Sequence, residues 1–87
     1  MYSDFYSGEI TRTAFRLKRK DPAHYFALRK KMDYILANPS HKYKELKYSM
    51  KGMKRVHIWH FVLVFKIDHK ERKVFFECYD HHDNVYL

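Results

Sequence analysis

The sequence predicts an α+β domain in which two N-terminal helices pack on one face of a small antiparallel sheet. Two apolar runs, 61–67 and 73–79, are rich in Val and Phe and flank the polar segment 68–72, a pattern typical of strands. Upstream of them, apolar residues recur every three or four positions, as they do along one side of a helix. The chain has 87 residues, enough for a single domain over 1–87 with one modest core.

The first predicted helix spans residues 8–20. Ser7 is a suitable N-cap for it. Its apolar stripe follows the spacing i, i+4 and i+7, at Ile10, Ala14 and Leu17. The short aromatic segment 1–6 before this helix can add an edge strand to the sheet.

The second predicted helix begins at Pro22 and ends at Ala37 or Asn38. Asp21 can cap it, Pro fits its first turn, and Pro39 disfavours helical backbone at Asn38. Its apolar stripe is Tyr25, Leu28, Met32 and Ile35 or Leu36. Because the two helices are joined so closely, we expect an αα-hairpin against the sheet.

A basic connector, residues 40–53, leads through a turn at Gly52 into a short first strand over Lys54–Ile58. The connector can line a phosphate track. Four of its lysines are therefore candidates for RNA binding: Lys42, Lys44, Lys47 and Lys51.

The three strands are expected to form a β-meander with turns at 59–60 and 68–72. Side chains alternate across a strand and opposed residues share a face. One face is then the core face, with Val56, Ile58, Phe61, Leu63, Phe65, Ile67, Val74, Phe76 and Cys78. The open face carries Arg55, His57, Val62, Val64, Phe75, Glu77, Tyr79 and His81. A shift of one residue would bury Arg55 and His57, so the hydrophobic pattern favours this register.

The positive charge is concentrated in the first two thirds of the chain. The net charge is +8; residues 1–55 hold 14 Lys/Arg against 5 Asp/Glu, and residues 56–87 hold 4 against 5. Such a surface attracts a polyanion, either nucleic acid or an acidic protein. The alternative is a solvated surface that keeps a small protein soluble.

The sequence points to the cytoplasm and not to a membrane. No apolar run approaches the roughly 20 residues needed to span a bilayer, and the N-terminus lacks the pattern of a signal peptide. The single Cys78 excludes an intrachain disulfide and fits a reducing compartment. Its expected place on the core face indicates packing and not nucleophilic attack.

Histidines are the main candidates for chemistry. His57, His60, His81 and His82 could supply zinc ligands. However, the first two straddle a turn and the last two are adjacent and tend to point apart, so we expect neither a metal nor another cofactor. No phosphate-binding loop or zinc-finger spacing is present.

Metal-free RNA cleavage is the better interpretation of these residues. RNA carries its own nucleophile, the 2′-hydroxyl, and needs a base, an acid and cations for the transition state. The open face offers Arg55, His57, Tyr79 and His81, with Tyr86 in the tail. An exposed aromatic ring can also stack on a base. Taken singly, each histidine is better explained as an ordinary surface residue, and it is their convergence on one predicted face that favours a site.

Three stretches resemble the RelE/ParE toxin superfamily, and its RelE-like branch most closely. They are DPxxY…ILANP, LK…MKGMKRVHIWHFVLVFKID and VFFECYDHHDNVY, and the likeness covers residues 7–87. The resemblance implies a ribosome-dependent endoribonuclease that cuts mRNA in the decoding site without metal and leaves a 2′,3′-cyclic phosphate. It also implies a cognate antitoxin as partner, alongside the ribosome and mRNA, with no membrane and no small-molecule cofactor.

The resemblance extends to individual residues. The family's basic residues on this strand match Lys54, Arg55 and His57, and its C-terminal pair followed by Val-Tyr matches His81, His82, Val85 and Tyr86. The catalytic candidates are thus His57 or His81 as base or acid, His82, Arg55 and Lys54 as residues that stabilise the phosphate, and Tyr86, which would orient the substrate or stack on it.

Two positions depart from the family pattern. Val62 and His82 stand where RelE proteins commonly have Arg; Arg55 or Lys54 could substitute for the missing cation. Two other functions stay open: inhibition of DNA gyrase, as in ParE-like members, and noncatalytic RNA binding.

Overall fold

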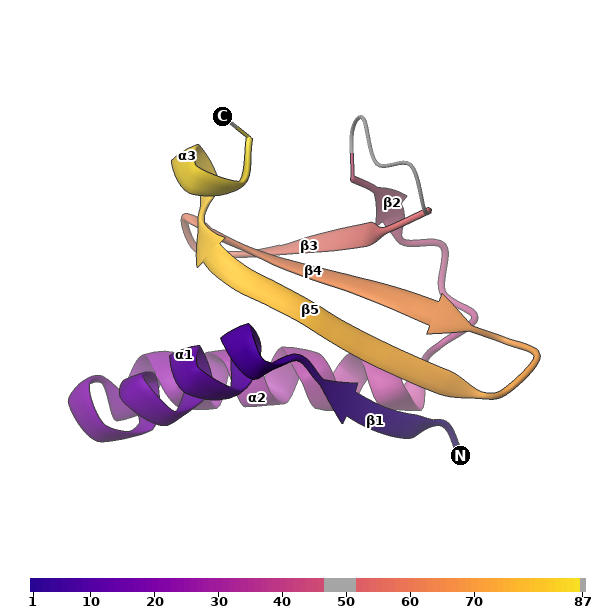
Figure 1. The fold of residues 1–87 in the computed structure, drawn as a ribbon, viewed down its shortest axis with the longest axis horizontal. Helices are drawn as coiled ribbons and strands as arrows, with labels where there is room; N and C mark the ends of the chain where they lie inside the picture. Colours follow the sequence, from indigo (N-terminus) through magenta and orange to yellow (C-terminus); the bar gives the residue numbers. More distant parts are fainter. Residues whose placement is uncertain (47–51, 87) are drawn as a thin grey trace.

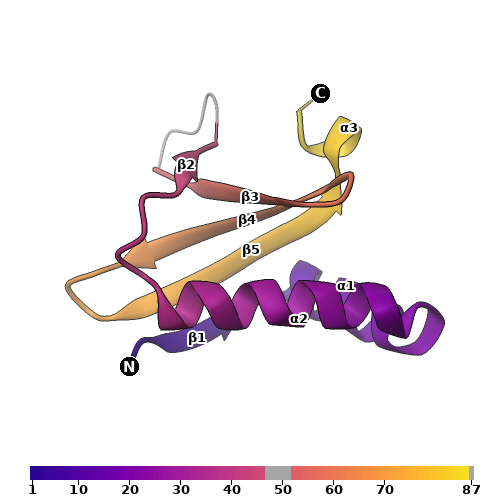
Figure 2. The same cartoon turned by 180° about the vertical axis from the view of Figure 1, so that it is seen from behind.

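The protein is a five-stranded sheet with two long helices on one side and a one-turn helix at the C-terminal end of the chain (Figures 1 and 2). The computed structural model describes residues 1–46 and 52–86. Its elements are β1 (Ser3–Tyr6), α1 (Gly8–Lys20), α2 (Pro22–Ala37), β2 (Lys44–Glu45), β3 (Lys54–Ile58), β4 (Phe61–Asp68), β5 (Lys73–His81) and α3 (His82–Val85). The mixed α+β class predicted from the sequence is confirmed.

The sheet has the order β1-β5-β4-β3-β2 and contains the predicted meander at its centre. The first hairpin has the expected register, with Val56 opposite Leu63 and Ile58 opposite Phe61. The strand count is higher than predicted, because part of the basic connector pairs with β3 as the two-residue strand β2. The N-terminal segment does form an edge strand, but it runs parallel to β5, so the sheet is mixed and not antiparallel throughout as predicted.

Both helix starts are capped as the sequence predicted. The Ser7 Oγ accepts a hydrogen bond from the backbone N–H of Ile10 at 3.1 Å. The Asp21 carboxylate accepts one from the N–H of His24 at 3.2 Å. The backbone N–H of Asp21 also donates to the carbonyl of Leu17, at 2.8 Å, so this residue ends α1 and begins α2. These caps satisfy donors and acceptors that helix ends leave free.

The core lies between the helices and the sheet. Its fully or nearly fully buried members are Ile10, Leu28, Met32, Ile35, Tyr43, Ile58, Leu63, Phe65, Val74, Phe76 and Tyr79. From α1 only Ile10 is fully buried, and the rest of its predicted stripe is partly buried. In α2 the buried stripe begins at His24, and the predicted Tyr25 is half-buried instead.

A β-bulge in β5 overturns the predicted alternation beyond Phe76. Phe65 pairs with Phe76 but Val64 pairs with Cys78, which leaves Glu77 as an extra residue without a partner on β4. Leu63 therefore opposes Tyr79, and Phe61 opposes His81. The predictions that Tyr79 and His81 lie on the open face and Cys78 on the core face were wrong, because the bulge reverses which face each residue joins.

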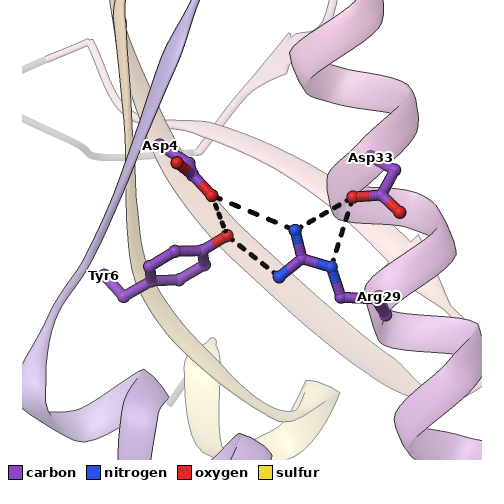
Figure 3. Close-up of polar contacts among 4 residues, drawn as sticks. All are labelled: Asp4, Tyr6, Arg29 and Asp33. Carbon is purple, nitrogen blue, oxygen red and sulfur yellow. Dashed lines mark hydrogen bonds and ion pairs between the residues drawn. The ribbon is translucent and has the colours of Figure 1, made fainter.

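A polar network ties the edge strand β1 to α2 (Figure 3). The Tyr6 hydroxyl donates to Asp4 at 2.6 Å and accepts from Arg29 at 3.0 Å. The same guanidinium donates to Asp33 through Nε at 3.2 Å and Nη2 at 3.0 Å, and its Nη2 lies 4.0 Å from Asp4. The network adds to the pairing of this exposed strand with β5 and to the stacking of Phe5 on Phe75 and of Tyr6 on Phe76.

Candidate active site

Four of the predicted catalytic side chains meet on the open face of the sheet, opposite the long helices. The rings of His57 and His82 stack with centroids 5.8 Å apart. The Tyr86 ring packs on the His82 ring, with centroids 4.6 Å apart. The Arg55 guanidinium lies 5.9 Å from the centroid of the Tyr86 ring. The cluster thus joins two residues of β3 to two from the C-terminal segment.

The short helix α3 brings His82 to His57. His81 caps α3, with its Nδ1 accepting from the N–H of Asp83 at 3.2 Å. The N–H of His82 donates to the carbonyl of His60 at 2.8 Å, which fixes the start of α3 to the β3–β4 turn. The N–H of Tyr86 donates to the carbonyl of His82 at 3.2 Å and closes the helical turn.

His57 has the electrostatics of a proton acceptor. Partial burial lowers its pKa below the ordinary value of 6.5, and the nearby charges of Arg55, His82 and Lys44 lower it further. A lowered pKa keeps this imidazole neutral at pH 7, and only a neutral imidazole can take up a proton.

The cations beside His57 are held by β2. Arg55 Nε donates to the backbone carbonyl of Glu45 at 3.2 Å. The amine of Lys54 lies 3.3 Å from the Glu45 carboxylate, which offsets part of its charge. Lys42 and Lys44 line a hollow of about 410 Å³ together with Arg55 and His57. The predicted Lys47 and Lys51 lie outside the described residues.

The other candidates lie elsewhere or are buried. His81 is on the face of Phe61, with ring centroids 5.5 Å apart, and its ring stacks at 6.3 Å on that of His60. Tyr79 is 2% exposed, so its predicted role in RNA binding is wrong; its hydroxyl lies 2.6 Å from His24 Nε2 in the core. Val62 is opposite His57 and fully buried.

Tyr86 has an unusual polar atom. Its hydroxyl is buried and has no hydrogen-bond partner within the described part of the chain. A buried hydroxyl without a partner costs free energy.

Two residues of the site's surroundings were missed at the sequence level, His24 and Trp59. The spacing of His24, Leu28 and Met32 at i, i+4 and i+8 is a helical stripe that could have identified the buried imidazole. Trp59 has φ 56° in the β3–β4 turn, as the predicted two-residue turn at 59–60 favours, but the packing of its ring on His24 was not predicted.

The structure also bears on metals and membranes. Among residues 1–46 and 52–86, no group of three or more His, Cys, Asp or Glu side chains is arranged to hold a metal ion. None of the described helices combines the length and apolar character that crossing a bilayer requires.

Comparison with known proteins identifies relatives of the whole fold, although no protein-family model matches the sequence. An uncharacterized protein of Methanosarcina mazei is 50% identical over 72 residues, which are 82% of this chain and 83% of that protein. A protein of Methanocaldococcus jannaschii named "Putative toxin RelE4" is 44% identical over 72 residues, 82% of this chain and 76% of that protein.

Solved toxin structures share the fold. A metal-bound toxin from Helicobacter pylori superposes with a TM-score of 0.79 at 19% identity, covering 99% of this chain and 100% of that chain. A chain of the toxin–antitoxin complex RelBE2 from Mycobacterium tuberculosis superposes with a TM-score of 0.74 at 18% identity, covering 92% of this chain and 96% of that chain. The 44% identity to the Methanocaldococcus protein over most of both chains goes further than a shared fold: this chain belongs to the RelE family of toxins.

Proposed function

We propose that this protein is the toxin of a type II toxin–antitoxin pair and a metal-independent, ribosome-dependent endoribonuclease that cleaves mRNA in the decoding site. The observation that carries the proposal is the pair of imidazoles, His57 and His82, stacked beside Arg55 on an open cationic face. Membership of the RelE family supports the toxin role. Such an enzyme works in the cytoplasm, where translating ribosomes are.

The imidazole pair can perform both proton transfers of the reaction. Neutral His57 takes the proton of the 2′-hydroxyl, and the 2′-oxygen attacks the adjacent phosphorus. The bond from phosphorus to the 5′-oxygen breaks, and protonated His82 gives its proton to that oxygen. The products are a 2′,3′-cyclic phosphate and a 5′-hydroxyl, and neither step needs a metal.

Arg55 and its neighbours supply the electrostatic part. The guanidinium stabilises the charge that develops on the phosphate oxygens. Arg55 and Lys44 take the place of the family arginine, because the residue opposite His57 is the buried Val62. Tyr86 orients the substrate from beside His82, where its ring can stack on a base.

An antitoxin is the expected protein partner. The Mycobacterium tuberculosis chain with this fold was solved in a toxin–antitoxin complex. The net charge of +8 favours an acidic partner that also competes with RNA.

The test is primer extension on an mRNA in a reconstituted translation reaction. Wild-type protein should cut within codons, only when ribosomes are present, and equally with a chelator of transition metals that leaves the Mg²⁺ of the ribosome in place. His57→Ala and His82→Ala should each lower the cleavage rate by about 10²–10⁴-fold, the usual contribution of a general base or acid. His81→Ala should have a much smaller effect, since its ring lies on the other face.

His69→Ala is the matched control, because this histidine lies in the β4–β5 turn, where it bonds to Tyr2. Cleavage at the wild-type rate by a folded His57→Ala, His82→Ala double variant would overturn the assignment. An intact message with wild-type protein would overturn the nuclease itself.

A further inference from the structure

A second hollow lies on the other side of His57, between α2 and the β3–β4 turn. It has a volume of about 380 Å³, and the residues that line it are Ala27, Lys30, Lys31, Tyr34, His57, Ile58 and Trp59. His57 and Lys31 also line the hollow that contains Arg55 and Lys44. His57 and Lys31 are therefore shared by two neighbouring hollows.

The lining of this hollow combines cations with exposed aromatic rings. Trp59 is 63% and Tyr34 is 46% exposed, far more than aromatic residues of the core. The amine of Lys31 lies 5.9 Å from the centroid of the Tyr34 ring. Among the described residues that line the hollow, none is acidic. Aromatic rings that stack on bases, beside cations that bind phosphates, are the usual means of holding a single nucleic-acid strand.

Trp59 is held in place at a cost. It is the first residue of a two-residue turn and has φ 56°, where hairpins of this pattern favour Gly. Its ring packs on the buried His24, with centroids 4.7 Å apart, and His24 is fixed in turn by its hydrogen bond to Tyr79. Positive φ at a bulky residue is unfavourable and persists where the surroundings enforce it. The exposed indole is thus held by His24 at the hollow that His57 also lines.

We propose that Lys31, Tyr34 and Trp59 form a nucleotide-binding subsite for the RNA strand next to the phosphate that is cleaved. A base stacks on the indole or the phenol ring, and Lys31 binds the phosphate between that nucleotide and the one at His57. The inference rests on the proposed function, because it takes RNA as the ligand of the same site.

The first experiment uses the fluorescence of Trp59, the single tryptophan of the chain. A short 2′-O-methyl oligoribonucleotide lacks the nucleophile, so it can bind but cannot be cleaved. Its titration into wild-type protein should quench the emission. Lys31→Gln and Tyr34→Ala should each raise the Kd about 5-fold or more. Lys70→Gln, in the β4–β5 turn, is the matched control and should leave the Kd unchanged.

The second experiment measures cleavage by the same folded variants in the translation reaction, with Trp59→Phe and Trp59→Leu added. At limiting protein the rate should fall for Lys31→Gln, Tyr34→Ala and Trp59→Leu. It should recover at saturating protein, since these residues bind substrate and transfer no proton. Trp59→Phe keeps an aromatic face and should retain most of the wild-type rate.

The two readouts separate the two proposals. Wild-type cleavage without quenching, and with variants as active as wild type, would overturn the subsite and leave the nuclease standing. Quenching that Lys31→Gln weakens, without any cleavage by wild type, would support the subsite and overturn the nuclease. Absence of both signals would overturn both.

Discussion

At the scale of single residues, His57 derives its character from its neighbours. The charge of Arg55 is one of the causes that lower its pKa, after burial. A general base is active only in its neutral form, so the cleavage rate should fall as pH falls through the pKa of this imidazole. Because that pKa is lowered, the fall should lie below pH 6.5 in the wild-type protein.

Arg55→Gln should therefore shift the acid limb of the pH–rate profile to higher pH. Removing the guanidinium raises the pKa of His57 and lowers the neutral fraction at any pH near it. The rate should drop at all pH values, since a phosphate ligand is lost, and it should drop most at acid pH. The measurement is a pH profile of ribosome-dependent cleavage, with Arg72→Gln, in the β4–β5 turn, as control. An unshifted limb would show that another group is the base.

At the scale of elements, Asp21 serves two helices at once. Its carboxylate caps α2 and its backbone N–H closes the end of α1. Asp21→Ala should lower the free energy of unfolding by about 1 kcal/mol, because it removes the side-chain cap and leaves the backbone bond intact. Asp21→Asn should cost much less, since the amide oxygen can accept the same hydrogen bond. Urea denaturation checks both, and equal losses would mean that charge and not capping is responsible.

The helices and the central strands could be predicted from the sequence, whereas the β-bulge and the shortest strand could not. The helix bounds followed from Ser7, Asp21 and Pro39, because capping and proline chemistry are local. The register of β3 with β4 followed from the hydrophobic alternation. The bulge at Glu77 could not be predicted from the sequence. An unpaired residue changes how two strands pair but leaves the amino-acid composition of both strands the same. The two-residue β2 was too short to show a period.

The candidate active site was only partly predicted, because the bulge was not foreseen. Arg55 and His57 lie on β3, whose pairing with β4 the bulge does not alter, so the alternation of side chains assigned them to the correct face. His81 and Tyr79 follow it, and the alternation assigned them to the wrong face. The family resemblance named His82 without depending on parity, and the structure puts that ring against His57.

At the scale of the whole molecule, the two hollows beside His57 form a cationic surface. Five cations line them: Lys30, Lys31, Lys42, Lys44 and Arg55. Single-stranded nucleic acid releases counterions on binding, with a slope of about −0.7 in log affinity against log salt for each phosphate neutralised. If each cation engages one phosphate, the slope for the 2′-O-methyl oligoribonucleotide should be about −3.5.

Fluorescence titrations at several salt concentrations measure this slope. Lys31→Gln should make it less steep by about 0.7, and Lys70→Gln should not change it. A slope near zero in the wild-type protein would show that these cations do not contact the RNA backbone.

The bulge at Glu77 has a mechanical consequence for the site. The start of β5 takes its register from the turn after β4, whereas its end is fixed by the bond from His82 to His60. The extra residue Glu77 lets both ends of β5 keep their own register with β4. A change of one residue in the length of this strand can be absorbed there. The position of His82 beside His57 is thus set by its bond to the β3–β4 turn and not by the register at the start of β5.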